Sequence, residues 1–292
     1  MELVIQNLNK QYANGVHALS NVNLTIGKGM FGLLGPNGAG KSSLMRTLAT
    51  LQDADSGTVK LGAIDVLNQK SEVRKILGYL PQEFGVYPRL SAIDLLDYLA
   101  MMKGITAAKE RRETVEYLLQ KVNLYEHRKK AVSSYSGGMR QRFGIAQCLI
   151  GQPQLVIVDE PTAGLDPGER NRFYNILAEI GENVIVILST HIVQDVRELC
   201  TEMAIMNGGK VLYSGSTENA LQLIKGKVWE RKIQKEKLNH YHENYKVISN
   251  KLVGGKPLIH VFDEGKPEGF EGAEENLEDV FFATLHGLVT VS

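Results

Sequence analysis

The chain has 292 residues, 43% of them apolar, which suits one large domain or two smaller ones with a substantial core. Lys and Arg number 33 and Asp and Glu number 33, so bulk charge gives no argument for binding to nucleic acid. Two cysteines are too few for a disulfide framework, and we find neither a signal peptide nor an apolar run of ~20 residues, so we expect a soluble chain in a reducing cytosol.

The first fifty residues predict two strands, and then a glycine-rich loop between a strand and a helix. Residues 3–8 and 22–26 alternate between apolar and polar side chains, as half-buried antiparallel strands do. Residues 30–34 form a short apolar run before the glycines. Beyond the glycines, apolar residues recur at helical spacing: Leu44, Met45, Leu48 and Leu51.

Residues 85–130 change character and predict a helical insert. Ser91 and Asp94 resemble a capping box that opens a helix, and Gly104 ends it. The helix has an apolar stripe and a second apolar face: Ala92, Leu95, Leu96, Leu99 and Met102, then Ile93, Tyr98 and Met101. The charged helix that follows has four inward positions: Val115, Leu118, Leu119 and Val122.

Alternating strands and helices come next and predict a parallel sheet. Residues 155–158 are continuously apolar, as expected for a strand whose sheet is covered on both faces. Asp166, Pro167 and Glu169 supply a helix cap, a proline in the first position and an acid in the first turn. Residues 184–188 predict the next buried strand, and the alternation as a whole indicates an α/β fold.

A break near residues 215–226 separates a smaller C-terminal part. Residues 228–230 and 256–262 predict strands, residues 263–275 predict a loop, and a last helix starts at Asn276. We interpret this part as a small α+β appendage.

The glycine-rich loop fits the phosphate-binding pattern G-x-x-x-x-G-K-[ST]. It consists of Gly35, Pro36, Asn37, Gly38, Ala39, Gly40, Lys41 and Ser42, and we count the next residue, Ser43, with it. The glycines let backbone N–H groups converge on the β- and γ-phosphates of a nucleotide. Lys41 neutralises phosphate charge as it develops, and the Ser42 hydroxyl ligates Mg²⁺.

Three polar side chains follow the buried strands. Asp159 can hold Mg²⁺, directly or through water, and Glu160 is placed to act as general base on an attacking water. The alternative for this pair is two solvated acids at a strand end. His191 lies where ligands bind in open α/β sheets, so it is either a γ-phosphate contact or a structural histidine.

These motifs, in this order, resemble the ATP-binding subunit of an ABC transporter over residues 1 to about 218. The resemblance implies an α/β P-loop NTPase of ABC type, with a parallel-sheet core, an N-terminal antiparallel β-subdomain and a helical insert at about residues 85–150. Residues 219–292 would form a small C-terminal α+β domain with an accessory or regulatory role. ATP and Mg²⁺ are the implied cofactors, and ATP hydrolysis is the implied reaction.

The resemblance assigns roles to single residues. Tyr12 stands where the family's adenine-stacking aromatic falls, and Gln82 matches the Q-loop glutamine that senses Mg²⁺, the attacking water and the membrane partner. His191 matches the switch histidine. The implied catalytic residues are Glu160, His191, Gln82 and Lys41, and the implied magnesium ligands are Ser42, Gln82 and Asp159.

Two further motifs imply an assembly. Ser136-Gly137-Gly138 matches the family's signature, although Tyr135 and Met139 replace the commoner Leu and Gln around it, and Gly164-Leu165-Asp166 matches the D-loop. In this family the phosphate loop and the signature of one chain face different nucleotides. We therefore expect a homo- or heterodimer, in which Ser136, Gly137, Gly138 and Asp166 bind the nucleotide held by the second ATP-binding subunit.

The tyrosine before the signature and the segments 80–88 and 277–281 resemble bacterial exporter ATPases, including the drug- and antibiotic-resistance kind. Their membrane subunit is a separate chain, so we expect a transmembrane permease as partner and no nucleic acid. The location would be cytoplasmic, peripheral on the inner face of the cell membrane. Phe84, Tyr87 and Leu90 either form part of a groove for the permease or close the core.

Two other functions fit the same motifs. A soluble ABC-type ATPase could act on nucleic acid or ribosomes, but the compact insert, the single ATPase unit and the neutral charge argue against it. An ABC importer ATPase is close in mechanism, and the appended domain and the signature variant favour export.

Overall fold

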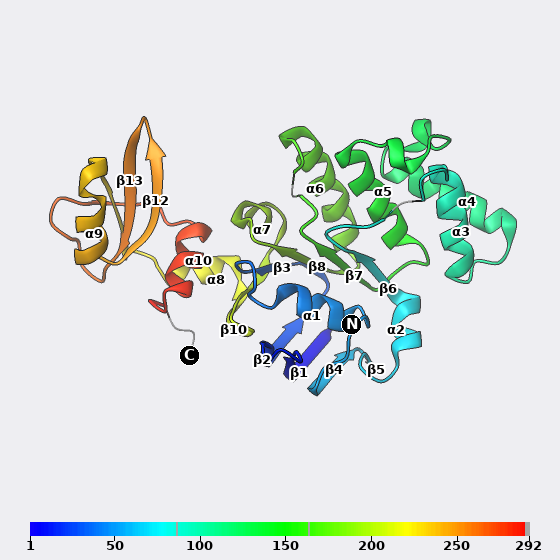
Figure 1. Ribbon diagram of the computed structural model, residues 1–292, viewed down its shortest axis with the longest axis horizontal. Helices are drawn as coiled ribbons and strands as arrows, with labels where there is room; N and C mark the ends of the chain where they lie inside the picture. Colours follow the sequence, from blue (N-terminus) through cyan, green and yellow to red (C-terminus); the bar gives the residue numbers. More distant parts are fainter. Residues whose placement is uncertain (86, 163, 290–292) are drawn as a thin grey trace.

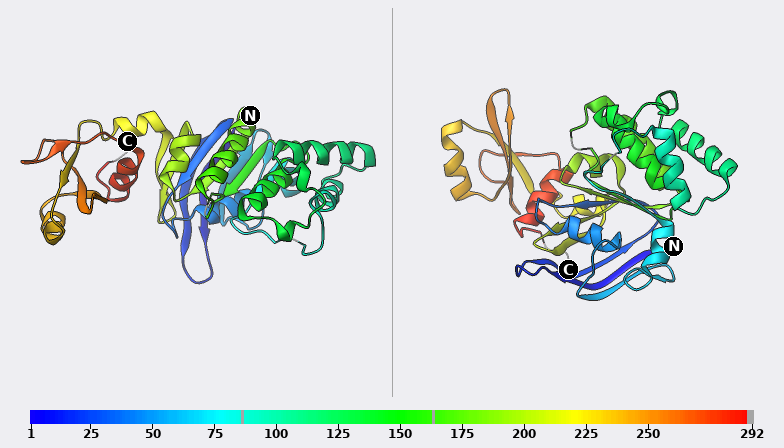
Figure 2. Two further views of the ribbon diagram at one scale, coloured as in Figure 1. Left: turned by 90° about the horizontal axis from the view of Figure 1, so that it is seen from above. Right: turned by 45° about the vertical axis from the view of Figure 1, so that its right-hand side comes forward.

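The structure, a computed structural model, describes residues 1–85, 87–162 and 164–289 and arranges them around three β-sheets. Two sheets and the helical insert form the larger part of the molecule, and the third sheet forms a C-terminal lobe (Figure 1). Seen from above, the molecule is elongated, with this lobe at one end and the helical insert at the other (Figure 2). Across the described ranges, no helix is long and apolar enough to cross a membrane.

The N-terminal sheet is antiparallel, as the alternating side chains predict. Its order is β2-β1-β4-β5, with β1 (Leu3–Gln11), β2 (His17–Ile26), β4 (Ser56–Leu61) and β5 (Ile64–Asp65). The pairing sets Leu3 opposite both Ile26 and Leu61. These inward side chains share a core with α1 and with one face of the central sheet.

The central sheet has the order β10-β9-β3-β8-β7-β6, and the five strands from β9 to β6 are parallel. Its strands are β3 (Gly29–Leu34), β6 (Leu77–Leu80), β7 (Leu155–Asp159), β8 (Ile185–Thr190), β9 (Glu202–Asn207) and β10 (Lys210–Ser216). Every residue of β7 and β8 is buried, which confirms the continuous apolar strands expected of a sheet covered on both faces.

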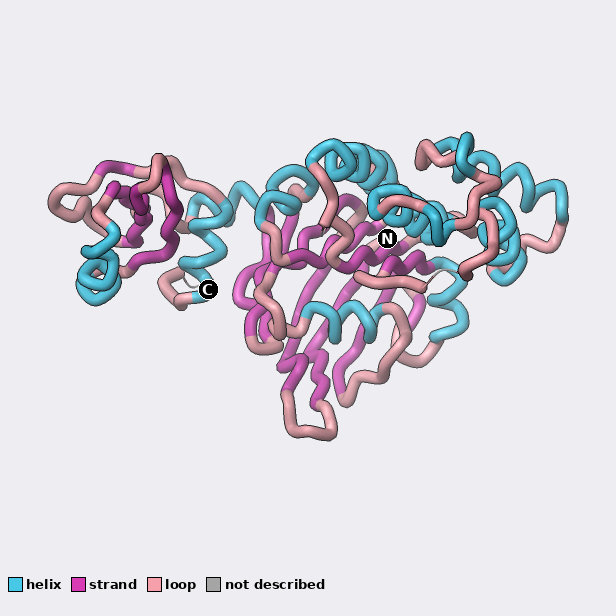
Figure 3. The backbone as a smooth tube through the Cα atoms, turned by 45° about the horizontal axis from the view of Figure 1, so that its top comes forward, coloured by secondary structure: helices cyan, strands magenta, loops and turns pink. Residues whose placement is uncertain are grey.

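Helices cover one face of the central sheet, and the N-terminal sheet with α1 (Lys41–Leu48) covers the other (Figure 3). The helices of the first face include α6 (Pro167–Gly181), which Asp166 caps, and α7 (Val193–Leu199). The prediction that the helix continues to Leu51 is wrong. The helix ends at Leu48, Thr50 turns the chain at φ 60°, and Leu51 is 57% exposed.

The helical insert forms as expected, with one correction. Its helices are α3 (Ala92–Met102), α4 (Ala108–Lys121), the 3-10 turns η1 (Tyr125–His127) and η2 (Val132–Ser134), and α5 (Gly137–Leu149). The short helix α2 (Lys70–Ile76) precedes the insert, and its Val73 belongs to the core of the N-terminal sheet. Ser91 caps α3 by accepting the Asp94 N–H at 3.3 Å. The predicted stripe is wrong at its end, because Ala100 is buried where α4 and α5 cover the helix, whereas Met102 is 68% exposed.

The C-terminal lobe is a four-stranded sheet of order β12-β13-β11-β14 with a helix on each face. Its elements are α8 (Thr217–Gln222), β11 (Val228–Lys232), η3 (Lys235–Lys237), α9 (Leu238–Asn244), β12 (Val247–Val253), β13 (Lys256–Phe262), β14 (Glu271–Gly272) and α10 (Leu277–Leu285). The sequence did not predict α9 or β12, because both expose most of their length and carry little periodic apolar signal. The expected loop over residues 263–275 contains the short strand β14.

The last helix, α10, joins the lobe to the rest of the molecule. It packs on β12 of the lobe and also on α7, α8, β9 and β10. Its buried apolar residues belong to the same core cluster as the helix-covered face of the central sheet. The boundary expected between residues 218 and 219 falls inside α8, and the division into two domains stays a prediction.

A buried network of hydrogen bonds and an ion pair holds α10 against the sheet of the lobe. The Nδ1 atom of His260 lies 2.9 Å from both carboxylate oxygens of Asp279, which is fully buried. Ser249 and Asn276 also donate to that carboxylate, at 3.2 and 2.7 Å. The hydrogen bond to Asp279 raises the pKa of His260 above its usual value, although burial opposes the change. Glu230, whose carboxylate lies 3.4 Å from Nε2, adds to the increase.

We expect Asp279→Asn to destabilise the protein, and more so at pH 6 than at pH 9. A pKa raised by folding contributes stability that is fully present below the unfolded-state pKa and is lost as the pH rises through the folded-state pKa. The loss at pH 6 should be about 1.5–3 kcal/mol, typical of a hydrogen bond to a charged group. Thermal unfolding of both proteins at the two pH values measures it, and an equal loss at both would contradict the ion pair.

Candidate functional site

The glycine-rich loop connects the end of β3 to the start of α1, as the phosphate-loop pattern predicts. Gly40 caps α1 at φ 103°, and a Cβ there would lie 2.4 Å from the Ala18 carbonyl oxygen. A Cβ on Gly35 would lie 2.5 Å from the Met206 carbonyl oxygen. Both positions therefore require glycine, one for its backbone conformation and both for the close approach of neighbouring backbone.

A cavity of about 700 Å³ opens beside this loop. Expected site residues that line it are Tyr12, Asn37, Gly38, Ala39, Gly40, Lys41, Ser42, Ser43, Gln82, Glu160 and His191. The structure thus brings together residues that lie as far apart in the chain as Tyr12 and His191. The Tyr12 hydroxyl is within 3.0 Å of Ser43 Oγ and 3.1 Å of Gln52 Oε1, which holds the exposed ring beside the loop.

Four lining residues were not predicted: Val16, His17, Ala18 and Gly208. The available signal was the pair Gly208-Gly209 directly after an apolar strand. Both glycines have positive φ and turn the chain from β9 to β10. The Gly209 N–H donates to the Ala39 carbonyl at 3.0 Å, and the Gly209 carbonyl accepts from the Ser20 N–H at 2.8 Å. This turn therefore fixes the phosphate loop against β2.

Lys41 is buried at the floor of the cavity. Its ammonium group donates to the carbonyl oxygens of Gly35 at 2.7 Å and Pro36 at 3.2 Å. Its Nζ lies 3.8 Å from Glu160 Oε1. Burial lowers the pKa of Lys41, and the nearby carboxylates of Glu160 and Asp159 oppose the decrease. A poorly solvated cation of this kind attracts an anionic ligand strongly.

Glu160 is the centre of the polar contacts in the cavity. His191 Nδ1 lies 3.0 Å from Glu160 Oε1, and Gln82 Nε2 lies 3.5 Å from Glu160 Oε2. The backbone N–H of Glu160 donates to the Ser189 carbonyl at 2.8 Å. Its φ of 47° is a left-handed conformation that a non-glycine residue adopts at some cost, and such strain clusters at functional sites.

Asp159 is buried behind Glu160, at the end of β7. Its Oδ1 atom has no hydrogen-bond partner among the residues that the structure describes. Burial raises the pKa of Asp159 and Glu160 adds to the increase, while the nearby Ser189 hydroxyl, Lys41 and Ser42 oppose it. An oxygen ligand that is desolvated and unsatisfied suits a bound cation.

The signature lies outside this cavity. Ser136 caps α5 by accepting the Met139 N–H at 3.2 Å, as expected, and Asp166 caps α6 by accepting the Glu169 N–H at 2.9 Å. Neither Ser136–Gly138 nor Asp166 is among the described residues that line the cavity. The sequence therefore predicted two groups of site residues. The structure brings the group around the phosphate loop together in one site and leaves the signature and Asp166 outside it.

The two signature glycines differ in their surroundings. A Cβ on Gly138 would lie 2.3 Å from Glu169 Oε2, which is held near Arg142 and Arg172 by ion pairs of 3.3 and 2.7 Å. A Cβ on Gly137 would meet no atom within 4 Å. Gly138 therefore permits packing within the chain, whereas the described part of the chain gives no steric reason for glycine at position 137.

We expect Asp159→Asn to raise the Tm of the protein measured without nucleotide or metal at neutral pH. The folded-state pKa of Asp159 lies above the unfolded value of 3.8, so its ionised form costs folding free energy at higher pH. The neutral amide removes that cost. The gain should shrink as the pH falls and the native carboxyl takes up a proton.

Differential scanning fluorimetry between pH 8 and pH 5 measures this gain, with the exposed Asp263→Asn as the matched control. A Tm of Asp159→Asn at or below the wild-type value at pH 8 would show that the carboxylate is not a destabilised group.

Comparisons with known proteins agree with these motifs. The sequence model of the ABC transporter family matches residues 19–163. The uncharacterized ABC transporter ATP-binding protein YxlF of Bacillus subtilis is 32% identical over 97% of this chain and 99% of its own. YbhF of Escherichia coli, a probable multidrug ABC transporter ATP-binding protein, is 34% identical over 72% of this chain, which spans 36% of YbhF.

A solved structure extends the similarity to the fold. The ATP-binding cassette MJ0796, a dimer in a post-hydrolysis state bound to ADP and Pi, is 25% identical and has a TM-score of 0.67. The match covers 73% of this chain and 98% of that one. The α/β P-loop fold of ABC type is therefore confirmed, and the chain belongs to the ABC transporter family as an ATP-binding subunit with ATPase activity.

Proposed function

We propose that this chain is the ATPase subunit of a membrane exporter, and that Mg-ATP-driven closure of two such subunits acts on a separate transmembrane permease. One observation carries the proposal: Lys41, Gln82, Glu160 and His191 converge on one cavity, while the signature lies outside it. One chain therefore offers a hydrolytic half-site and, elsewhere, a second half-site that needs a partner. The multidrug name of YbhF and the exporter-like segments 80–88 and 277–281 favour export.

The catalytic roles follow from the contacts of Glu160. Its carboxylate accepts the proton of the water that attacks the γ-phosphate, as a general base. His191 and Gln82, at 3.0 and 3.5 Å from the two carboxylate oxygens, orient Glu160 and contact the γ-phosphate and the water. Lys41 neutralises charge that develops on the phosphate oxygens. Gly35 to Ser43 bind the phosphates, and the exposed Tyr12 ring stacks on adenine.

The residues beside the phosphate loop suit Mg²⁺. The unsatisfied and buried Oδ1 of Asp159, the Ser42 hydroxyl and the Gln82 side-chain oxygen are hard oxygen donors, which this ion prefers. We propose that these three residues hold it. Bound there, the ion would supply positive charge to the β- and γ-phosphates.

The signature and the D-loop complete the site of a second subunit. We propose that Ser136, Gly137, Gly138 and Asp166 contact the nucleotide bound by the phosphate loop of that subunit. The N-terminus of α5 is an anion site, because Ser136 leaves further N–H groups of the first turn free to bind phosphate. The partner is a second copy or a related ATP-binding subunit.

We expect Glu160→Gln to abolish steady-state ATP hydrolysis and to accumulate an ATP-bound dimer. The amide keeps the shape of the side chain but cannot accept the proton, so the closed dimer does not turn over. Size-exclusion chromatography with Mg-ATP measures the dimer, and a colorimetric phosphate assay measures hydrolysis, for which we expect a loss of at least about 100-fold. Unchanged hydrolysis would rule out Glu160 as the base.

Adding Gly137→Ala to Glu160→Gln gives the matched control. The new methyl group meets no atom within 4 Å among the described residues of its own chain, so the Tm should stay near that of Glu160→Gln. It would lie between the signature and the nucleotide of the partner, so the ATP-bound dimer should be lost. A dimer that persists would exclude this arrangement of the signature.

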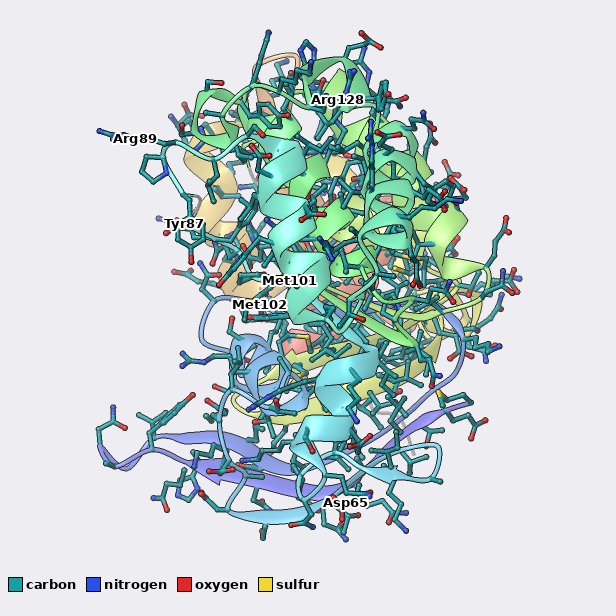
Figure 4. The ribbon with its side chains drawn as sticks, turned by 90° about the vertical axis from the view of Figure 1, so that its right-hand side faces the viewer. Asp65, Tyr87, Arg89, Met101, Met102 and Arg128 are labelled. Carbon is teal, nitrogen blue, oxygen red and sulfur yellow. The ribbon has the colours of Figure 1, made fainter. Side chains whose placement is uncertain are left out.

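The permease would bind where the helical insert meets the core. Met101, Met102 and Tyr98 of α3 are 48%, 68% and 44% exposed, and Tyr87 is 59% exposed. Figure 4 faces this side of the molecule and shows Tyr87, Met101 and Met102 on it. Phe84 and Leu90, by contrast, pack against the main core. Phe84 and Leu90 therefore help to close the core, and the exposed Tyr87 is the member of this group that is accessible to a permease.

A cavity of about 350 Å³ lies next to these methionines, between α3, α5 and β6. Leu77, Tyr79, Leu99 and Met102 supply apolar walls. Exposed apolar side chains around a recess are typical of a protein–protein contact. We propose that a cytoplasmic segment of the permease docks here, which would place the chain peripherally on the inner face of the cell membrane.

We expect Met102→Glu to weaken the association with the permease without changing ATP hydrolysis by the isolated subunit. A carboxylate that loses water in this contact costs binding free energy. Co-purification of an integral membrane protein with each variant, compared with the wild-type subunit, measures the association. Tyr117→Glu on α4, a residue that is 59% exposed, is the control and should bind normally. Equal binding by both variants would place the contact elsewhere.

We further propose that residues 1–218 form the ATP-binding domain, with its helical part at about 85–150, and that residues 219–292 form an accessory or regulatory domain. The separate sheet and the separate aromatic cluster of the C-terminal lobe support this division.

A further inference from the structure

A fully buried carboxylate, Asp195 of α7, lies outside the cavity and has no role in the mechanism above. Three hydroxyl groups donate to it: Thr162 Oγ1 at 2.6 Å, Thr190 Oγ1 at 2.9 Å and Tyr174 OH at 2.5 Å. Its exposed fraction is 0%. All three of these donors are neutral. Burying a carboxyl group completely is costly, so its presence calls for a physical explanation.

Two of the donors come from segments that border the catalytic cavity, and the third comes from α6. Thr162 lies two residues after Glu160 and just before the segment Gly164–Asp166. Thr190 is the last residue of β8 and directly precedes His191. Tyr174 lies on α6, the helix that Asp166 caps. One carboxylate thus connects the chain that follows the general base, the chain that precedes the switch histidine, and the helix that follows the D-loop.

The contacts of Thr190 hold the backbone on both sides of His191. Its hydroxyl donates to Asp195 and accepts the Ile192 N–H at 2.9 Å. The Asp195 N–H donates to the Ile192 carbonyl at 3.1 Å. The His191 side chain itself is 46% exposed, and its Nδ1 lies 3.0 Å from Glu160. The orientation of the ring toward Glu160 therefore depends on the backbone at positions 190–192.

Tyr174 remains a donor under all ordinary conditions. Burial raises the pKa of its hydroxyl, and the hydrogen bond to Asp195 raises it further. The Tyr174 hydroxyl is therefore a stable donor to Asp195.

We propose that Asp195 is a positioning residue for ATP hydrolysis, which holds His191 against Glu160. The proposal rests on the roles proposed for Glu160 and His191. It assigns Asp195 no contact with nucleotide. A loss of this carboxylate displaces His191 while the phosphate loop, on a different element, keeps its geometry. Displacements of about 1 Å in a catalytic group lower rates roughly 100-fold.

The test is a double-mutant cycle of Asp195→Asn with His191→Ala, measured as kcat for ATP hydrolysis below the Tm of every variant. We expect Asp195→Asn to lower kcat by about ten- to a hundredfold, with nucleotide affinity changed by less than about threefold. If Asp195 acts through His191, the double variant should be no slower than His191→Ala alone. Full additivity of the two effects would overturn the proposal.

Asp279→Asn is the matched control, because Asp279 is also fully buried and hydrogen-bonded but lies in the C-terminal lobe. It should lower the Tm and leave kcat per folded molecule near the wild-type value. A fall of kcat in Asp279→Asn as large as in Asp195→Asn would mean that destabilisation alone explains the loss. Wild-type hydrolysis by His191→Ala would refute the proposed role of His191, which is a different outcome from additivity.

Thr190→Val gives a second route if Asp195→Asn does not fold. It keeps the shape of the side chain and removes one of the three donors. Its loss of kcat should also disappear in the His191→Ala background, with nucleotide affinity unchanged. An additive loss, or no loss of kcat, would contradict the proposal as clearly as the first cycle.

Discussion

The parallel pairing of β3, β7 and β8 determines where the chemistry of this protein takes place. The register sets Leu34 beside Thr190 and Asp159 beside Ser189, so the three strands end at one edge of the sheet. The phosphate loop, Glu160 and His191 are the next residues after those ends. Because the strands are buried on both faces, a slip in register would move apolar side chains as well as the site, and packing therefore protects the geometry.

The cavity carries an energetic cost that its ligands can offset. Burial disfavours the charged forms of both Lys41 and Asp159, and the left-handed Glu160 adds backbone strain. A polyanion beside Lys41 and a cation beside Asp159 would each restore the charge balance that the folded chain lacks. Enzymes typically hold their catalytic groups ready for reaction at a cost to the stability of the fold.

Local chemistry in the sequence predicted much of the fold and the phosphate loop, whereas the roles of Tyr12, Gln82 and the signature came from the family resemblance. Continuous apolar runs predicted β7 and β8, and caps predicted the starts of α3, α6 and α10, because these signals depend on neighbouring residues only. The lining residues Val16 to Ala18 carry no such signal, since their place depends on the turn at Gly208-Gly209. Met102 shows the same limit, because periodicity does not tell which face a neighbouring helix covers.

The position of α10 has a consequence for how the chain folds while it is being synthesised. Its residues Leu277, Val280 and Phe281 complete the core cluster that contains Val156, Val186 and Met203. During synthesis the central sheet therefore emerges and pairs while part of its helical cover has not yet been made. The apolar surface of α7 and α8 stays open to water, or to a chaperone, until the C-terminal sheet has been translated and α10 docks.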